Sequence, residues 1–221
     1  DGNVRTAASY GHVDVVRYLC DLPPDRGVNP SSEDNHAIWG AVLSGHLDVV
    51  RYLCDLPRDR GVDPSAESNR AVCTAAQHGH VHVVEYLCDL PPDRGVDPSA
   101  RRNRAICTAA QHGHVHVLEY LCDLPPDRGV DPSAGDNEAI WAAAMHGHVE
   151  VVEYLCDLPC DRGVDPSARN NQAIWVAACG GHAEVVEYLC DLPPDRGVDP
   201  SVDDGHAVWG AAKHGHVHVV R

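Results

Sequence analysis

The chain repeats itself every 34 residues. The dipeptide Gly-His begins at Gly11, Gly45, Gly79, Gly113, Gly147, Gly181 and Gly215. Other columns keep the same register, with asparagine at positions 35, 69, 103, 137 and 171. A fixed period of this length is the signature of repeat architectures, in which each unit buries its apolar faces against its neighbours. We therefore predict a single repeat domain over residues 1–221, with about seven repeats of which the first and last are incomplete.

One unit, residues 69–103, indicates how each repeat folds. Asn69 is a good N-cap residue, and residues 70–78 have the apolar face of a short helix. Gly79 ends that helix, because glycine readily adopts the left-handed backbone of a helix C-terminus. Residues 80–90 form the second predicted helix, and residues 91–100 are rich in turn formers. The repeat is then a helix, a tight turn, a second helix and a long loop, whose recurring Asp-Arg pair predicts an ion pair.

The segment from Ala75 to Leu87, AAQHGHVHVVEYL, resembles the ankyrin repeat motif Ala-Ala-x-x-Gly-His-x-x-Val-Val-x-x-Leu. It recurs in every copy, so the resemblance covers the whole chain. The tetratricopeptide repeat shares the period but needs two longer helices. The ankyrin resemblance implies an all-α fold, a curved, right-handed solenoid stack of helix-turn-helix repeats with loops or reduced β-hairpins between them.

The chain departs from the ankyrin pattern at the start of the first helix. The usual Thr-Pro-Leu-His, which ties neighbouring repeats together, is replaced by segments such as His36-Ala37-Ile38-Trp39. We expect packing of the tryptophans to replace that tie. They stand at Trp39, Trp141, Trp175 and Trp209.

Charge and cysteine placement exclude several classes of protein. The formal net charge is -16, which disfavours binding to nucleic acid and to anionic membranes. Six of the ten cysteines share one column, at positions 20, 54, 88, 122, 156 and 190. Packed helices lie too far apart for these to form disulfides, so we predict buried free thiols and a cytoplasmic or nuclear location. Cys160 lies in a loop and is the expected exposed thiol.

The histidines and the loop residues indicate neither a metal centre nor an enzyme. Several turns contain three histidines, as at His78, His80 and His82. The His80 column matches the structural histidine with which ankyrin repeats cap the second helix, and no known zinc-ligand spacing occurs. No nucleophile or nucleotide-binding motif is present. The sequence predicts no cofactor, no metal and no catalytic residue.

The positions that vary most between copies predict where a partner binds. They lie just before each first helix and at its end, which in the ankyrin family line the concave face and its rim. We call the following residues the variable surface: Arg70, Gln77, His78, Arg101, Arg102, Arg104, Gln111, His112, Asp136, Glu138, Met145, His146, Arg169 and Gln172. Four arginines cluster in adjacent repeats, at positions 70, 101, 102 and 104, and arginine suits carboxylate partners. A protein partner with an acidic segment is expected.

Two other functions stay open. The chain could be the substrate-recruiting arm of a larger enzyme or of a ubiquitin-ligase adaptor, or an architectural or engineered scaffold. Neither end of the sequence resembles a polar capping repeat. We therefore expect a piece of a longer array, with frayed terminal repeats, existing as a monomer or in weak end-to-end association.

Overall fold

The computed structural model describes residues 2–22 and 28–220, with the backbone alone for residues 33, 34, 58, 203 and 204. Within that part of the chain all regular secondary structure is helical, so the connections between repeats are loops, not β-hairpins. The first copy of the Asp-Arg pair, Asp25-Arg26, lies outside the described residues. The chain forms two compact units, Asp1–Arg101 and Arg102–Arg221, which we describe separately.

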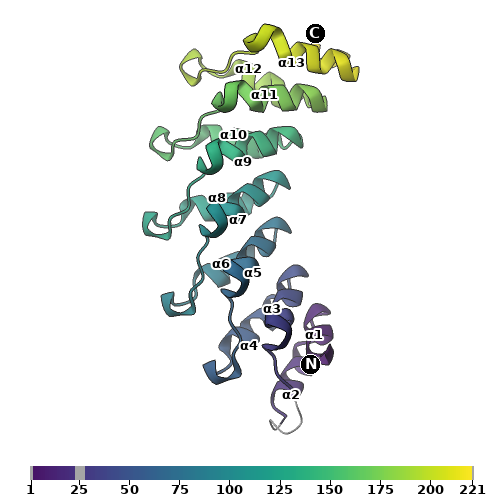
Figure 1. Cartoon of the computed structure of the whole chain (residues 1–221), viewed down its shortest axis with the longest axis vertical. Helices are drawn as coiled ribbons and strands as arrows, with labels where there is room; N and C mark the ends of the chain where they lie inside the picture. The colour runs from purple at the N-terminus through teal and green to yellow at the C-terminus, as the bar shows by residue number, and fades with distance from the viewer. Residues whose placement is uncertain (1, 23–27, 221) are drawn as a thin grey trace. The chain divides into compact units, whose positions relative to one another are not determined.

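Unit 1 stacks three helical pairs. The first helices of its repeats are α1 (Gly2–Ser9), α3 (Ser32–Leu43) and α5 (Ala66–Gln77), and they lie side by side in one layer (Figure 1). The second helices pack against them as another layer, formed by α2 (Val13–Cys20), α4 (Leu47–Asp55) and α6 (Val81–Cys88). The long loops after α4 and α6 contain the 3-10 turns η2 (Arg58–Arg60) and η3 (Pro92–Arg94).

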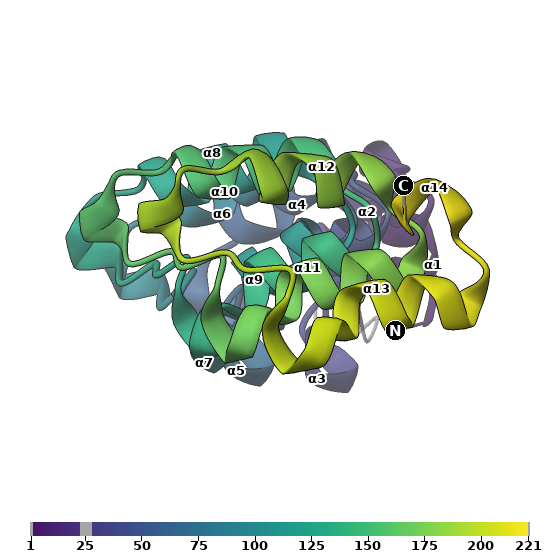
Figure 2. The same cartoon turned by 90° about the horizontal axis from the view of Figure 1, so that it is seen from above.

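Unit 2 repeats the same plan. Figure 2 shows the first helices α9 (Ala134–Met145), α11 (Ala168–Gly180) and α13 (Val202–His214) in one layer. The second layer holds α8 (Val115–Asp123), α10 (Val149–Asp157) and α12 (Ala183–Asp191). Helix α7 (Ala100–Gln111) begins at the unit boundary, and α14 (Val217–Val220) is the last helix. The loop turns are η4 (Pro126–Arg128), η5 (Cys160–Arg162) and η6 (Pro194–Arg196).

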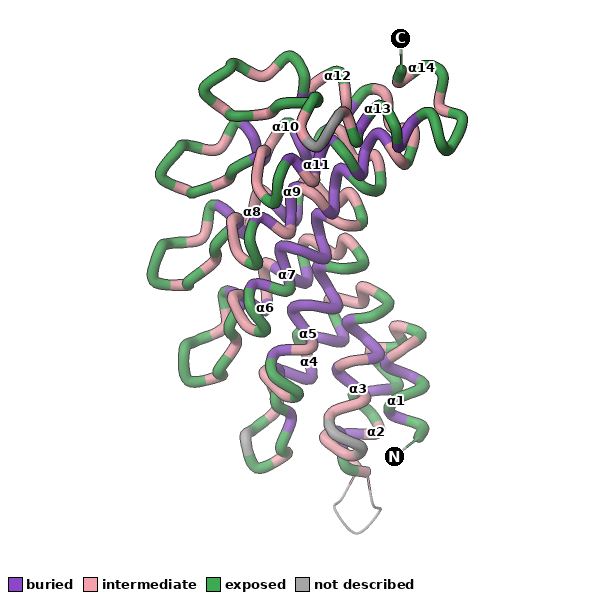
Figure 3. Tube along the Cα trace, turned by 45° about the horizontal axis from the view of Figure 1, so that its top comes forward, coloured by how far each residue is buried: buried purple, intermediate pink, exposed green. Residues whose placement is uncertain are grey.

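The core lies between the two layers of helices. Figure 3 shows the buried residues as a continuous stripe along the first helices of each unit. In unit 2 the second helices contribute Leu121 and Leu155, and the first helices contribute Ile140 and Ile174; all four are at most 2% exposed. Burying a side chain of this size stabilises the fold by about 1.5–3 kcal/mol. Alanines such as Ala143 fill the rest of the first-helix face and let adjacent repeats pack closely.

The predicted helices are confirmed, with one addition at their start. Right-handed helix begins after Asn69, as expected, but the three preceding positions form a left-handed turn, with φ of 51° at Glu67, 53° at Ser68 and 63° at Asn69. The same turn recurs at residues 101–103, 135–137 and 169–171. Left-handed backbone costs an L-residue about 1–2 kcal/mol, so packing of the flanking helices must hold these turns in place.

The cysteine column is buried and unbridged in five of its six copies, as predicted. Burial raises the pKa of Cys122 and Cys156 to about 11, which keeps both thiols protonated and inert. The exposed thiol of Cys160 is also confirmed. The prediction was wrong for Cys190, which is exposed.

Candidate protein-binding surface

The Gly-His dipeptide joins neighbouring repeats. The ring nitrogen Nε2 of His80 donates to the carbonyl of Leu43 at 3.1 Å, at the end of the preceding first helix. The same ring lies on Gly45, where an added Cβ would stand 2.6 Å from Nδ1 of His80. Gly45 also has φ of +74°, so it needs to be glycine for two reasons. His80 occupies the predicted N-cap position of the second helix but makes no side-chain cap there, so its bond serves the neighbouring repeat.

The asparagine column bonds to the end of the long loop, where the chain enters the next repeat, which corrects its predicted role as a helix cap. The side-chain oxygen of Asn69 accepts a hydrogen bond from the amide of Asp97 in the following loop, at 2.8 Å. Asn137 and Asp165 repeat the contact at 2.8 Å. The Asn side chain is 8% exposed in both copies. The capping oxygen is therefore used by the loop that leads into the next repeat, because the left-handed turn directs it away from its own helix.

The arginines of four loops, at positions 60, 94, 162 and 196, bond to a carbonyl of the preceding repeat. At Arg60, Arg162 and Arg196 this bond takes the place of the predicted ion pair with the aspartate beside them. Arg162 donates to the carbonyl of Cys122 at 2.8 Å, and Arg60 donates to Cys20 at 2.9 Å. These carbonyls end a second helix, where the backbone lacks partners and the helix dipole favours a cation. The invariant loop arginine thus caps the second helix of the neighbouring repeat.

The structure places the variable surface on the exposed parts of the first-helix layer. Every one of its residues is exposed or half-buried. Arg101, Arg102, Asp136 and Arg169 lie in the left-handed turns, and the residues from Gln77 to His78 and from Met145 to His146 lie at the ends of first helices. The Gly-His and loop-arginine columns bond between repeats, whereas the variable columns lie at exposed or half-buried positions.

The clustered arginines make different contacts. In unit 1, Arg70 pairs with the Glu67 carboxylate at 2.8 Å, and Arg101 donates to the Glu67 backbone carbonyl. In unit 2, Arg104 lies 3.7 Å from Glu138, and both side chains are well exposed. An exposed pair of this kind contributes about 0–1 kcal/mol. Arg102 is exposed as well.

The tryptophans do not share one packing role, which corrects that expectation. Trp39 and Trp141 are half-buried, whereas Trp175 is 38% exposed and Trp209 is 55% exposed. The guanidinium of Arg70 stacks on Trp39 at 4.2 Å from the ring centre, and that of Arg169 lies over Trp141 at 5.4 Å. The ammonium of Lys213 lies 4.8 Å from the ring of Trp209.

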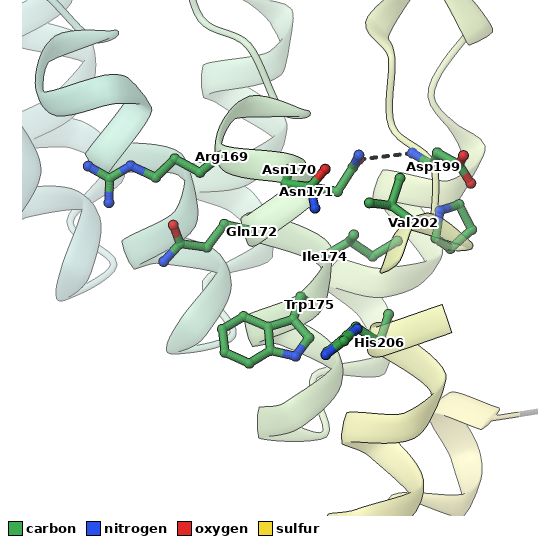
Figure 4. A pocket seen from close by; sticks show the side chains of 11 residues that line it. Arg169, Asn170, Asn171, Gln172, Ile174, Trp175, Asp199, Val202 and His206 are labelled. Carbon is green, nitrogen blue, oxygen red and sulfur yellow. Dashed lines mark hydrogen bonds between the residues drawn. The ribbon is translucent and has the colours of Figure 1, made fainter. Parts of the chain in front are cut away.

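A groove of about 440 Å³ opens beside Trp175 in unit 2, between α11 and α13 (Figure 4). Ile174 and Val202 form its apolar floor, and Asn171, Asp199 and His206 contribute polar edges. The variable-surface residues Arg169 and Gln172 also line it. Sequence analysis missed this groove. The available signal for the groove was a difference within one column, which holds Arg70 in one repeat and His206 four repeats later.

Two further findings bear on chemistry. Within residues 2–22 and 28–220, no group of three or more His, Cys, Asp or Glu side chains is arranged to hold a metal ion. None of the helices in this part of the chain has the length and apolar character needed to cross a membrane.

Comparison with known proteins places these features in a family. Residues 4–68, 56–136 and 124–204 match a family model of ankyrin repeats. A search of curated proteins gave no match. The solved human ASB11 ankyrin repeat domain is similar, with 18% identity, a TM-score of 0.71, and coverage of 98% of this chain and 96% of that one. The ankyrin repeat domain of Bcl-3, a member of the IκB protein family, has 19% identity, a TM-score of 0.65, and coverage of 99% and 98%. At these identities the likeness is one of fold.

Proposed function

Because the chain belongs to the ankyrin repeat family, we propose that it is a protein–protein interaction scaffold that binds its partner through the variable surface. Ankyrin repeat domains are in general modules for protein interaction and are typically not enzymes. The observation that supports the choice of surface is that recurring and variable residues have different roles within each repeat. The recurring Gly-His and Arg residues bond between repeats and the recurring Asn bonds to the loop that leads into the next repeat, whereas the exposed residues of the first-helix layer change from copy to copy.

The test is capture of partners with two matched variants. Met145→Lys with Gln111→Lys changes the variable surface, and Glu150→Gln with Glu184→Gln changes exposed positions on second helices. Both double variants raise the net charge by the same amount. We expect a saturable protein partner to bind the wild-type chain and the second-helix variant but to be lost or weakened at least tenfold by the first variant. A partner that is lost only by the second-helix variant would refute the proposed surface.

We propose further that Arg101, Arg102 and Arg104 contact an acidic segment of the partner. Arginine presents a planar fork of donors that matches carboxylates, and the weak pairing of Arg104 with Glu138 leaves that guanidinium available. Arg102→Glu should weaken partner binding and flatten its dependence on salt. Binding that keeps its strength and its salt dependence in this variant would remove the acidic segment from the proposal.

The chain's chemistry supports the remaining parts of the proposal. Ten free cysteines favour a reducing compartment, the cytoplasm or the nucleus. A net charge of -16 opposes nucleic acid as a general partner. The invariant loop arginines, as at Arg162, bond between repeats, which favours a scaffold without catalytic activity of its own.

A further inference from the structure

The groove beside Trp175 has an equivalent in unit 1 that is closed. Trp39 lies four repeats before Trp175 in the same column. Its groove is lined by matching residues, with Ile38 for Ile174 and Asp63 for Asp199, but its volume is only about 20 Å³. In the open groove the volume is about 440 Å³. The two sites share matching lining residues, and one difference between them is what covers the indole.

An arginine covers the indole in the closed groove. The guanidinium of Arg70 stacks on Trp39 at 4.2 Å and is held by the Glu67 carboxylate at 2.8 Å. In unit 2, Trp141 is covered in a similar way. Arg169 lies 5.4 Å from that ring and bonds to the Asp136 carboxylate at 3.1 Å. The chain thus twice pairs an indole face with a guanidinium backed by a carboxylate, an arrangement that cation–π attraction favours.

At Trp175 the covering arginine is missing. His206 occupies the position of Arg70, and its ring packs against Trp209, with 5.9 Å between the ring centres. Among the described residues, no cation lies over Trp175, and the indole is 38% exposed. Arg169 lines the groove, but Figure 4 shows its side chain extending away from Trp175. Its guanidinium group bonds to Asp136 and lies over Trp141.

A carboxylate lines this groove and gives it negative charge. Asp199 lines it, is exposed, and accepts hydrogen bonds from the amide of Ser201 at 2.9 Å and from its hydroxyl at 2.6 Å. These bonds lower the pKa of Asp199, so the carboxylate stays ionised. In the sequence, Asp203 occupies the column of Glu67, the residue that holds Arg70.

We propose that the Trp175 groove is a binding site for an arginine side chain of the partner protein, which stacks on the indole as Arg70 stacks on Trp39. This proposal rests on the proposed scaffold function and adds the chemistry of one anchor residue. Arginine fits better than lysine, because a planar guanidinium stacks on an indole face over a larger area. The acidic character of the chain, with a net charge of -16, favours approach of a cationic segment.

The test follows the four indole N–H signals of the full ¹⁵N-labelled chain by NMR, each assigned with a Trp→Phe variant. The probe is the capped tripeptide Gly-Arg-Gly, with citrulline in place of arginine as the neutral isostere and a lysine tripeptide as the second comparison. We expect the arginine peptide to shift the Trp175 signal and to leave Trp39 and Trp141 unmoved. The citrulline peptide should bind about tenfold more weakly. Equal responses to arginine and citrulline, or a stronger response to lysine, would overturn the proposal.

Two reciprocal variants test directly whether the Trp175 groove takes an arginine in the way that Trp39 takes Arg70. His206→Arg places an arginine where Arg70 stands in unit 1 and should abolish the response of Trp175. Arg70→His removes the cover from Trp39 and should make that indole respond to the same peptide. A Trp175 response that persists in His206→Arg would refute the assignment. Partner capture by the variable surface is a separate measurement, so a silent Trp175 with normal capture would overturn the arginine site alone and leave the scaffold function standing.

Discussion

At the scale of single residues, the recurring histidine and asparagine bond to backbone groups of the repeat before or of the loop that leads into the next one. His80 bonds to a carbonyl 37 residues earlier, and Asn69 bonds to an amide 28 residues later. The sequence predicted that these columns are structural, because they do not vary. It could not predict their partners, since a backbone carbonyl or amide leaves no signal in the residue types.

The contact between Gly45 and His80 predicts a coupled effect on stability. Gly45→Ala puts a Cβ on a residue with φ of +74° and 2.6 Å from the His80 ring. The left-handed backbone alone costs about 1–2 kcal/mol, and the overlap adds to it. In a His80→Ala background only the backbone cost remains. We expect a double-mutant cycle from urea unfolding to give a coupling of about 1 kcal/mol or more. Additive costs would show that the ring does not rest on the glycine.

Histidine in the Gly-His column predicts a loss of stability in acid. Burial lowers the pKa of His148 from 6.5, an effect that the nearby His146, His112 and His182 reinforce and the bond to the Gln111 carbonyl opposes. Between pH 6.5 and the lowered pKa, the unfolded chain binds a proton that the folded chain does not. The free energy of unfolding therefore falls as the pH drops below 6.5 and levels off below the lowered pKa.

The check is a titration of the His148 ring by NMR, paired with thermal unfolding between pH 7.5 and 5. His148→Gln should unfold with a shallower dependence on pH than the wild-type chain, because the difference isolates one of the 16 histidines. A His148 ring that titrates at or above 6.5 would contradict the sign of this prediction.

At the scale of helices and loops, the long loop ties neighbouring repeats together. Arg162 in η5 bonds to the last turn of α8 through the carbonyl of Cys122 at 2.8 Å, and Arg196 in η6 bonds to the carbonyl of Cys156 at the end of α10. The sequence indicated a loop from its proline, glycine and aspartate content. It did not indicate the 3-10 turn that aims the arginine at the neighbouring helix.

Removing this loop arginine should destabilise unit 2. A hydrogen bond from a charged donor contributes about 1.5–3 kcal/mol, so Arg162→Met should lower the free energy of unfolding by about 1–3 kcal/mol. Arg102→Met is the matched control, because Arg102 is exposed in a turn, and it should change stability by less than about 0.5 kcal/mol. Urea unfolding followed by circular dichroism compares the two. Equal effects would assign no special role to the loop arginine.

Helical periodicity did not predict the left-handed turns before the first helices. The column that holds Glu67, Arg101 and Arg169 holds Gly135 in one copy, and glycine is the residue that prefers positive φ. That single glycine was the available signal. The other copies adopt the same backbone with charged residues, because the packing of the flanking helices determines the turn more strongly than local preference does.

At the scale of the whole molecule, the 34-residue period predicted a stack of repeats, and the resemblance of the segment from Ala75 to Leu87 predicted the family. The surface for a partner was predicted from the variation between copies. All residues of that surface are exposed or half-buried, as a binding role requires. The open groove at Trp175 depended on the absence of one covering side chain, which only the structure revealed.

The most direct test of the scaffold function is hydrogen–deuterium exchange on the chain with and without its captured partner. We predict that the partner slows exchange in the left-handed turns and at the ends of first helices, including residues 101–104, 111–112, 145–146 and 169–172, and leaves the exposed faces of α8, α10 and α12 unchanged. Protection confined to those second helices, with the first-helix layer unaffected, would contradict the account.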